Sequence, residues 1–133
     1  MKIYSIEKQK LELFIERYEN FIKNGEYGKK ELSVGDKDRV SMMIIDLCCI
    51  CDQHRKSSSY WNNSSIDEFV KNNQDFYQRC KVVRDSFIAH LDHSNEKMLK
   101  INNTIENLSL DDSIAFKNFY ILCRDIISTA EII

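Results

Sequence analysis

The chain has 133 residues, 43% of them hydrophobic, and a formal net charge of −2 at pH 7. This length suits one domain, residues 1–133, and the hydrophobic content is sufficient for a packed core, which excludes wholesale disorder. The near-neutral charge excludes a protein that coats nucleic acid through bulk positive charge, but it leaves room for a local basic site.

Local features of the sequence also indicate where the protein works. The N-terminus lacks the hydrophobic region of a signal peptide, and no apolar run is long enough to span a membrane. We therefore expect a cytoplasmic protein without a membrane partner. The five cysteines are an odd number in a domain large enough to fold without disulfides, so we expect them to be reduced.

The pattern of the chain predicts an all-α domain. There is no proline, and the three glycines all lie between residues 25 and 35, so few residues interrupt the long periodic segments. The first helix is expected over about residues 5–24, with Ser5 as its cap, and the second over about residues 37–55. Their hydrophobic residues recur at steps of three and four and form one stripe on each helix. These stripes are Leu11, Phe14, Ile15, Tyr18 and Ile22, followed by Val40, Met43, Ile44, Leu47, Cys48 and Cys51.

Two further amphipathic helices follow the polar loop after residue 55. The third is expected to start at Ser65 and to end near residues 92–95, and the last is expected to open with Ser109 as its cap. Phe87 lies at the centre of the third helix's stripe near its C-terminal end. Four amphipathic helices with one stripe each predict an up-down bundle.

The segment "KVVRDSFIAHLDHSN", residues 81–95, places charged side chains beside this stripe. Arg84 and His90 lie about 60° to either side of Phe87 on a helical wheel, so both can reach the rim of the core. A histidine can transfer a proton near neutral pH, and a guanidinium can hold a phosphate and stabilise the charge that develops on it. RNA supplies its own nucleophile, the 2′-hydroxyl. The pair therefore suits RNA cleavage without a metal.

The stretch "RDSFIAHLD" resembles the motif of HEPN domains, in which an arginine and a polar residue precede a histidine after four further residues. The phrase "IAHLD" is most similar to the abortive-infection branch of that family. The resemblance implies a dimeric helical bundle in which two Arg/His sets share a cleft, and in many members a metal-independent ribonuclease acting as a toxin or antiviral effector. It assigns catalysis to Arg84 and His90 and a supporting role to Asp85. Asp92, His93 and Lys81 are the candidates for substrate binding.

Two groups of residues suggest a metal, but core packing is the better interpretation of the first. Cys48, Cys51 and His54 recur at three-residue steps, yet a structural zinc site needs four ligands, and both cysteines lie on the apolar stripe. His90 and His93 lack a second ligand cluster nearby in the sequence. We expect no metal and no other cofactor.

The sequence therefore predicts an endoribonuclease in which His90 takes or positions the 2′-hydroxyl proton and Arg84 stabilises the charged phosphate. Asp85 orients a catalytic side chain or its neighbour across the dimer. The expected partners are RNA, a second copy of the chain, and an antitoxin or other protein. The alternative is a bundle of the same fold without turnover that binds a protein or a nucleotide, and the near-neutral net charge favours it. Burial of Arg84 and His90 against carboxylates of the same chain would favour this alternative, whereas an open cleft would favour the nuclease.

Overall fold

The computed structural model describes the backbone of residues 2–23, 34–54, 64–89, 103–105, 107–108 and 112–132. It describes the side chains of the same residues except 34, 53–54, 64 and 86–89.

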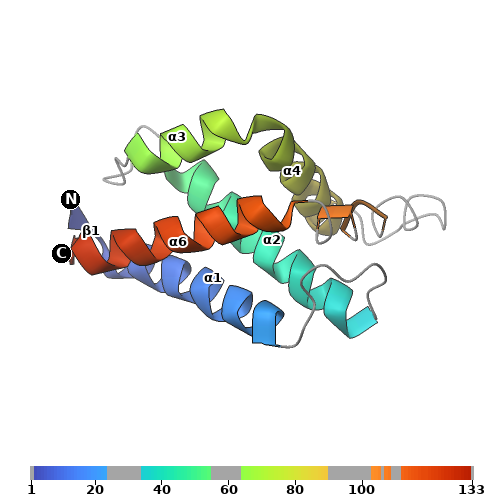
Figure 1. Ribbon diagram of the computed structural model, residues 1–133, viewed down its shortest axis with the longest axis horizontal. Coiled ribbons are helices and arrows are strands. Elements are labelled where there is room, and N and C mark those ends of the chain that lie inside the picture. Colours follow the sequence, from blue (N-terminus) through green and yellow to red (C-terminus); the bar gives the residue numbers. More distant parts are fainter. Residues whose placement is uncertain are drawn as a thin grey trace.

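Within these ranges the chain is an all-α helical bundle, which confirms the predicted fold class. Successive long helices reverse direction (Figure 1), except that α3 leads directly into α4. The central helix α2 packs against α1 and α4, and α6 packs against α1. The helices are α1 (Ser5–Lys23), α2 (Val34–His54), α3 (Ser64–Asn72), α4 (Gln74–Ala89) and α6 (Ser113–Thr129).

The two ends of the chain lie side by side, as Figure 1 shows at the ends marked N and C. They form a pair of two-residue parallel strands, β1 (Lys2–Ile3) and β2 (Glu131–Ile132), with Lys2 opposite Glu131. The sequence pattern did not predict these strands, because two residues are too few to show a period. Ile3 is fully buried, so this pairing closes one end of the core.

The core is built around aromatic rings from four helices. Phe119 of α6 packs its ring 4.9 Å from that of Phe14 and 5.0 Å from that of Phe69, measured between ring centroids. Phe116, one turn earlier, meets the ring of Phe76 edge-on at 4.9 Å. Edge-on and tilted pairs at such distances add to the free energy gained by burying the rings. These contacts join α1, α3, α4 and α6 into one core.

The predicted stripe of α2 is confirmed, whereas that of α1 is wrong at one position. Val40, Met43, Ile44, Leu47, Cys48 and Cys51 are all fully buried. On α1, however, Ile22 is 42% exposed and Phe21 is buried. Phe21 faces the core because it packs against α6, where its ring lies 6.4 Å from that of Phe116.

The first helix is capped by a different residue from the one predicted. The carbonyl of Tyr4 accepts the first helical hydrogen bond from the Lys8 amide at 3.1 Å. The Tyr4 amide donates to the carboxylate of Glu7 at 2.7 Å. This is the return half of a capping box, with Tyr4 rather than Ser5 at the cap position.

The predicted third helix is divided in two at Asn73. The side-chain amide and the backbone amide of Asn73 both donate to the carbonyl of Phe69, at 2.9 and 3.0 Å. Asparagine side chains that bond to nearby backbone in this way compete with regular helix. The carbonyl of Asn73 then accepts from the amide of Tyr77 at 2.8 Å, which starts α4. The break lets α3 and α4 cover different parts of the core (Figure 1).

The last helix starts later than the sequence predicts. The residue before α6 is Asp112, whose carboxylate makes no capping bond to the helix. It accepts two hydrogen bonds from Arg79 of α4 instead, at 2.6 and 2.8 Å. These bonds raise the pKa of the Arg79 guanidinium. The helix start is therefore fixed by a two-bond ion pair to α4, a contact between distant residues that sequence spacing does not reveal. The predicted cap, Ser109, lies outside the described residues.

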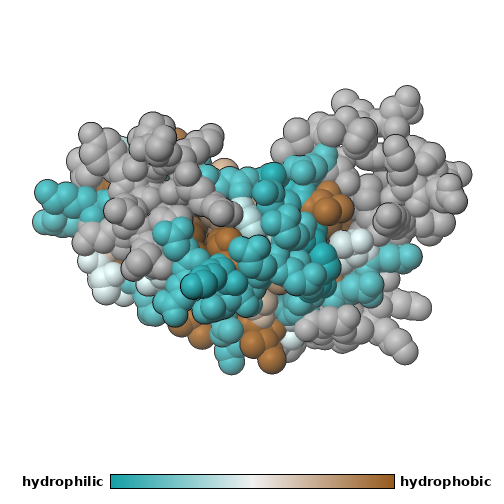
Figure 2. Space-filling view, turned by 90° about the horizontal axis from the view of Figure 1, so that it is seen from above, coloured by the Kyte–Doolittle hydropathy of each residue, from teal (hydrophilic) through white to brown (hydrophobic). Residues whose placement is uncertain are grey.

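The outer surface of α3 and α4 is polar. Figure 2, which views the bundle from above Figure 1, shows mainly hydrophilic side chains on the described part of this face. Hydrophobic side chains appear there as small separate groups. Among the described residues, no helix is long and apolar enough to cross a membrane.

Candidate functional site

Arg84 is held between two helices by carboxylates. Its Nε and Nη2 atoms donate to the Oδ1 of Asp85, the next residue on α4, at 3.1 and 2.9 Å. Its Nη1 atom donates to the carboxylate of Asp52 near the end of α2, forming an ion pair. The Arg84 side chain is 18% exposed, so it lies at the boundary between the core and the surface, as the sequence predicts.

Asp52 is itself held by a buried tyrosine. The hydroxyl of Tyr77, a fully buried residue two turns before Arg84 on α4, donates to the Oδ1 of Asp52. The Oδ2 of Asp52 accepts from Arg84. The two oxygens of one carboxylate therefore serve two different side chains of the facing helix, and the chain of bonds runs from Tyr77 through Asp52 to Arg84.

The contacts of Arg84 with other described residues do not use all of its hydrogen-bond donors. An arginine side chain carries five N–H donors. The described contacts use three of them, two toward Asp85 and one toward Asp52. The arrangement leaves one N–H on each terminal nitrogen to be accounted for, which is the number that a phosphate oxygen pair accepts from an arginine fork.

Lys81 adds a second positive charge to α4, three residues before Arg84. It lies one turn before Asp85 on α4, and its Nζ atom is 5.4 Å from the centroid of the Tyr77 ring. A cation at this distance over an aromatic face is attracted to it. The side chain is partly exposed, and the contact draws its ammonium group toward Tyr77, one turn nearer the start of α4.

The structure brings together half of the residues that the sequence predicts for the site. Lys81, Arg84 and Asp85 share the C-terminal half of α4. The backbone of α4 is described as far as Ala89, and three predicted residues lie outside the described residues: His90, Asp92 and His93. The side chain of Phe87, predicted to separate Arg84 from His90, also lies outside them.

Sequence reasoning missed Asp52 and Tyr77. The signal for Asp52 was present, because it is a charged residue directly after Cys51, the last member of a fully buried stripe. A carboxylate in that position needs a partner at the core boundary. The signal for Tyr77 was weaker, since a tyrosine beside Phe76 is explained by core packing alone.

The cysteines near this cluster are core residues. Cys48 and Cys51 of α2 are fully buried, as are Cys80 and Cys123, whereas Cys49 is exposed. Burial raises the pKa of the Cys48 thiol to about 12, although the positive charge of Arg84 acts in the opposite direction. A thiol with so high a pKa stays protonated at neutral pH and is a poor nucleophile. No group of three metal-ligating side chains occurs among the described residues, and the side chain of His54 is outside them.

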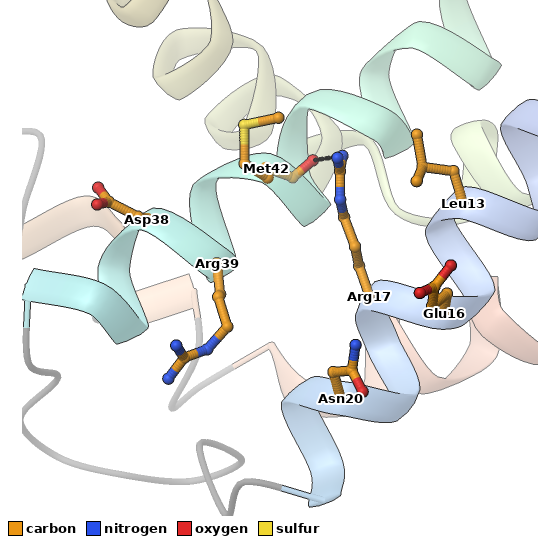
Figure 3. Close-up of a pocket in the computed structure, with 7 residues that line it drawn as sticks. All are labelled: Leu13, Glu16, Arg17, Asn20, Asp38, Arg39 and Met42. Carbon is orange, nitrogen blue, oxygen red and sulfur yellow. Dashed lines mark hydrogen bonds between the residues drawn. The ribbon is translucent and has the colours of Figure 1, made fainter.

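A hollow lies away from Arg84, between α1 and the first half of α2 (Figure 3). It has a volume of about 400 Å³. Arg17 of α1 extends across it toward α2 and pairs with Asp46, while Arg39 pairs with Asp36. Met42 in its wall and Asp52 are ten residues apart on one helix, a rise of about 15 Å. Since both guanidinium groups have carboxylate partners, the hollow offers less to a phosphate than its two arginines suggest.

By fold the chain is an all-α helical bundle within the described ranges, and its candidate site is Arg84, which pairs with Asp85 on α4 and with Asp52 on α2. Comparison with protein-family models, with curated proteins and with solved structures found no match.

Proposed function

We propose that the protein is a metal-independent endoribonuclease of the HEPN type, acting as a toxin or antiviral effector. The observation that supports this most directly is the state of Arg84, which is oriented by Asp52 and Asp85 and remains partly exposed at the C-terminal end of α4. The sequence motif continues from that helix end to His90. A cation with a fixed orientation costs little reorganisation when charge develops on a phosphate.

Each residue of the motif has a defined part in the proposed reaction. His90 takes the proton of the RNA 2′-hydroxyl, whose oxygen attacks the adjacent phosphorus. Arg84 donates to the phosphate oxygens as their charge increases. The bond to the 5′-oxygen then breaks, and this oxygen takes up a proton from water or from the His90 of a second copy of the chain. The products are a 2′,3′-cyclic phosphate and a free 5′-hydroxyl. Asp85 orients Arg84, and Lys81 contributes positive charge beside it.

The number of hydrogen-bond donors, rather than net charge, favours a dimeric form of the enzyme. Around Arg84, the described side chains include two bases (Lys81, Arg84) and two carboxylates (Asp52, Asp85), so the cluster of one chain is close to neutral. A phosphodiester bound by one chain alone would meet little net attraction. A second copy related by a twofold axis would bring its carboxylates too, so the net charge would stay close to zero. It would also bring the remaining N–H donors of another Arg84, and another His90, to the same phosphate.

We therefore expect the protein to be a dimer in solution. Light scattering at micromolar concentration should give twice the chain mass of 15.7 kDa. A particle of 15.7 kDa throughout the micromolar range would contradict the shared site.

The direct test of the function is cleavage of a single-stranded RNA in the presence of EDTA. We expect cleavage to continue without divalent metal and to leave 2′,3′-cyclic phosphate ends, detected by mass spectrometry. His90→Ala should lower the rate by roughly 10²–10⁴-fold because it removes proton transfer. The same RNA with 2′-deoxy substitution at the cleavage site should not be cut. Loss of cleavage on adding EDTA would refute the metal-free reaction, and Asp92 and His93 would then be examined as ligands.

A second candidate function is a binding module without turnover. The observation that favours it is that the carboxylates around Arg84 belong to its own chain, so that the arginine serves to join α2 to α4. This alternative predicts that Arg84→Ala lowers stability and that no RNA is cut under any condition. Nuclease activity that depends on His90 would exclude it.

A further inference from the structure

We propose that Asp52, held by Tyr77, is the positioning residue for Arg84. The effect on cleavage rests on the proposed ribonuclease function, whereas the orientation of Arg84 does not. The inference concerns two residues that lie outside the motif and that the sequence did not single out. The geometry that points to it is the shared carboxylate, with Tyr77 on one oxygen and Arg84 on the other.

Tyr77 is the fixed point of the arrangement. Its side chain is fully buried, and a buried tyrosine ring has only two rotatable bonds, both limited by packing. The hydroxyl therefore occupies one place at the interface of α2 and α4. A carboxylate that accepts its hydrogen bond is restrained in turn, so the plane of the Asp52 carboxylate is set by a residue of the core rather than by solvent.

The guanidinium is restrained from two sides. Asp85 accepts from Nε and Nη2 at one edge, and Asp52 accepts from Nη1. Asp85 lies on the same helix as Arg84, and its side chain is 65% exposed. If Asp85 were the partner on its own, the two side chains could move together in solvent. Asp52 comes from the facing helix and is 33% exposed. The bond from α2 thus fixes the position of the guanidinium relative to the rest of the bundle.

Two other ion pairs show what this arrangement adds. Arg79 gives both terminal nitrogens to one carboxylate, that of Asp112, and the pair joins α4 to the start of α6. Arg17 meets Asp46 between α1 and α2. In the described contacts neither of these carboxylates is also held by a buried hydroxyl. Asp52 is shared with Tyr77, which suits a function in which the direction of the guanidinium matters.

The first arm of the test observes Arg84 without requiring activity. Held guanidinium groups rotate slowly, so their terminal nitrogens give separate NMR signals, whereas a freely rotating group gives averaged ones. We expect separate signals for Arg84 in the parent, assigned by their loss in Arg84→Lys, and averaged signals in Asp52→Asn and Tyr77→Phe. Separate signals that survive Asp52→Asn would overturn the inference whether or not the protein cuts RNA.

The second arm measures cleavage. Displacement of a catalytic group by about 1 Å can lower a rate by roughly 10²-fold. We therefore expect Asp52→Asn to reduce kcat by about 10²-fold with KM close to that of the parent, and Tyr77→Phe to reduce it less. In the Arg84→Lys background, Asp52→Asn should have no further effect, because the two residues act as one unit. Equal losses in both backgrounds, or an increase in kcat on Asp52→Asn, would refute positioning.

Asp46→Asn is the matched control. It removes a carboxylate from the same helix and breaks an ion pair with another arginine, Arg17, without touching Arg84. We expect parent kcat and parent Arg84 signals. A drop in kcat equal to that of Asp52→Asn would show a general effect of altering α2 and would overturn the assignment. If the parent cuts no RNA, the proposed function fails, and the NMR arm still decides whether Asp52 orients Arg84.

Discussion

Arg84→Ala is expected to lower the rate of RNA cleavage by about 10²–10³-fold, the range found when one donor to a developing oxyanion is removed. The reason is that Arg84 is the only motif cation whose orientation is fixed by bonds from two helices in the described part of the chain. The measurement is single-turnover cleavage of a labelled RNA in EDTA, with thermal melting of the same samples.

The fold should survive this substitution. Removal of Arg84 leaves Asp52 with its bond from Tyr77 and with partial access to water, since Asp52 is 33% exposed. The free energy of unfolding should therefore fall by no more than about 1–2 kcal/mol. A fully buried carboxylate left without its partner would cost more than this.

Arg79→Ala is the matched control for Arg84→Ala. Arg79 lies on the same helix, also pairs with two carboxylates (Asp75 and Asp112), and is 35% exposed. Its loss should lower the melting temperature, because it fixes the start of α6, but should leave the cleavage rate of the folded protein unchanged. Equal rate losses in the two variants, or a parent rate in Arg84→Ala, would remove Arg84 from the catalytic site.

The fold class was predictable because hydrophobic periodicity reports directly on burial. Every predicted member of the α2 stripe, from Val40 to Cys51, is fully buried. The predicted burial was wrong where the exposure of a residue depended on a neighbour distant in the sequence. Phe21 replaces Ile22 in the core because Phe116 of α6 lies opposite it. The sequence of α1 alone does not show on which side α6 will pack.

The helix boundaries were predicted less well for a related reason. Ser5 and Ser109 have the side chains that commonly cap helices, yet α1 is capped at Tyr4 and α6 begins after Asp112. In both cases the bond of an acidic side chain fixes the helix start. The carboxylate of Glu7 accepts from the Tyr4 amide, and the carboxylate of Asp112 accepts from Arg79. Propensity is a weak preference that such specific bonds override.

The motif identified Arg84 and Asp85, but it did not identify Asp52 and Tyr77, the residues elsewhere in the sequence that hold Arg84 in place. The bond between Arg84 and Asp85 joins adjacent residues and is visible in the sequence. The bond to Asp52 spans 32 positions and that from Tyr77 to Asp52 spans 25. Such contacts require the packing of α2 on α4, so the sequence could place the cation on the rim of the core without identifying its support.

Phe119→Ala is expected to lower the free energy of unfolding by about 3–5 kcal/mol, the usual cost of removing a buried phenylalanine ring. Phe119 is fully buried and contacts rings on two other helices, Phe14 on α1 and Phe69 on α3. Its removal leaves a cavity bounded by rigid rings, which cannot close fully.

The measurement is urea denaturation followed by circular dichroism, with the slope of the transition compared between variants. Ile121→Ala on the same helix is the control, because that side chain is 44% exposed and its loss should cost no more than about 0.5 kcal/mol. Within the described part of the chain, the ring contacts of Phe119 are with α1 and α3 rather than with the part of α4 that carries Arg84. A Phe119→Ala variant that remains folded should therefore cut RNA at the parent rate, the reverse of the result for Arg84→Ala. Similar stabilities for the two α6 variants would show that the aromatic cluster around Phe119 does not hold α1, α3 and α6 together.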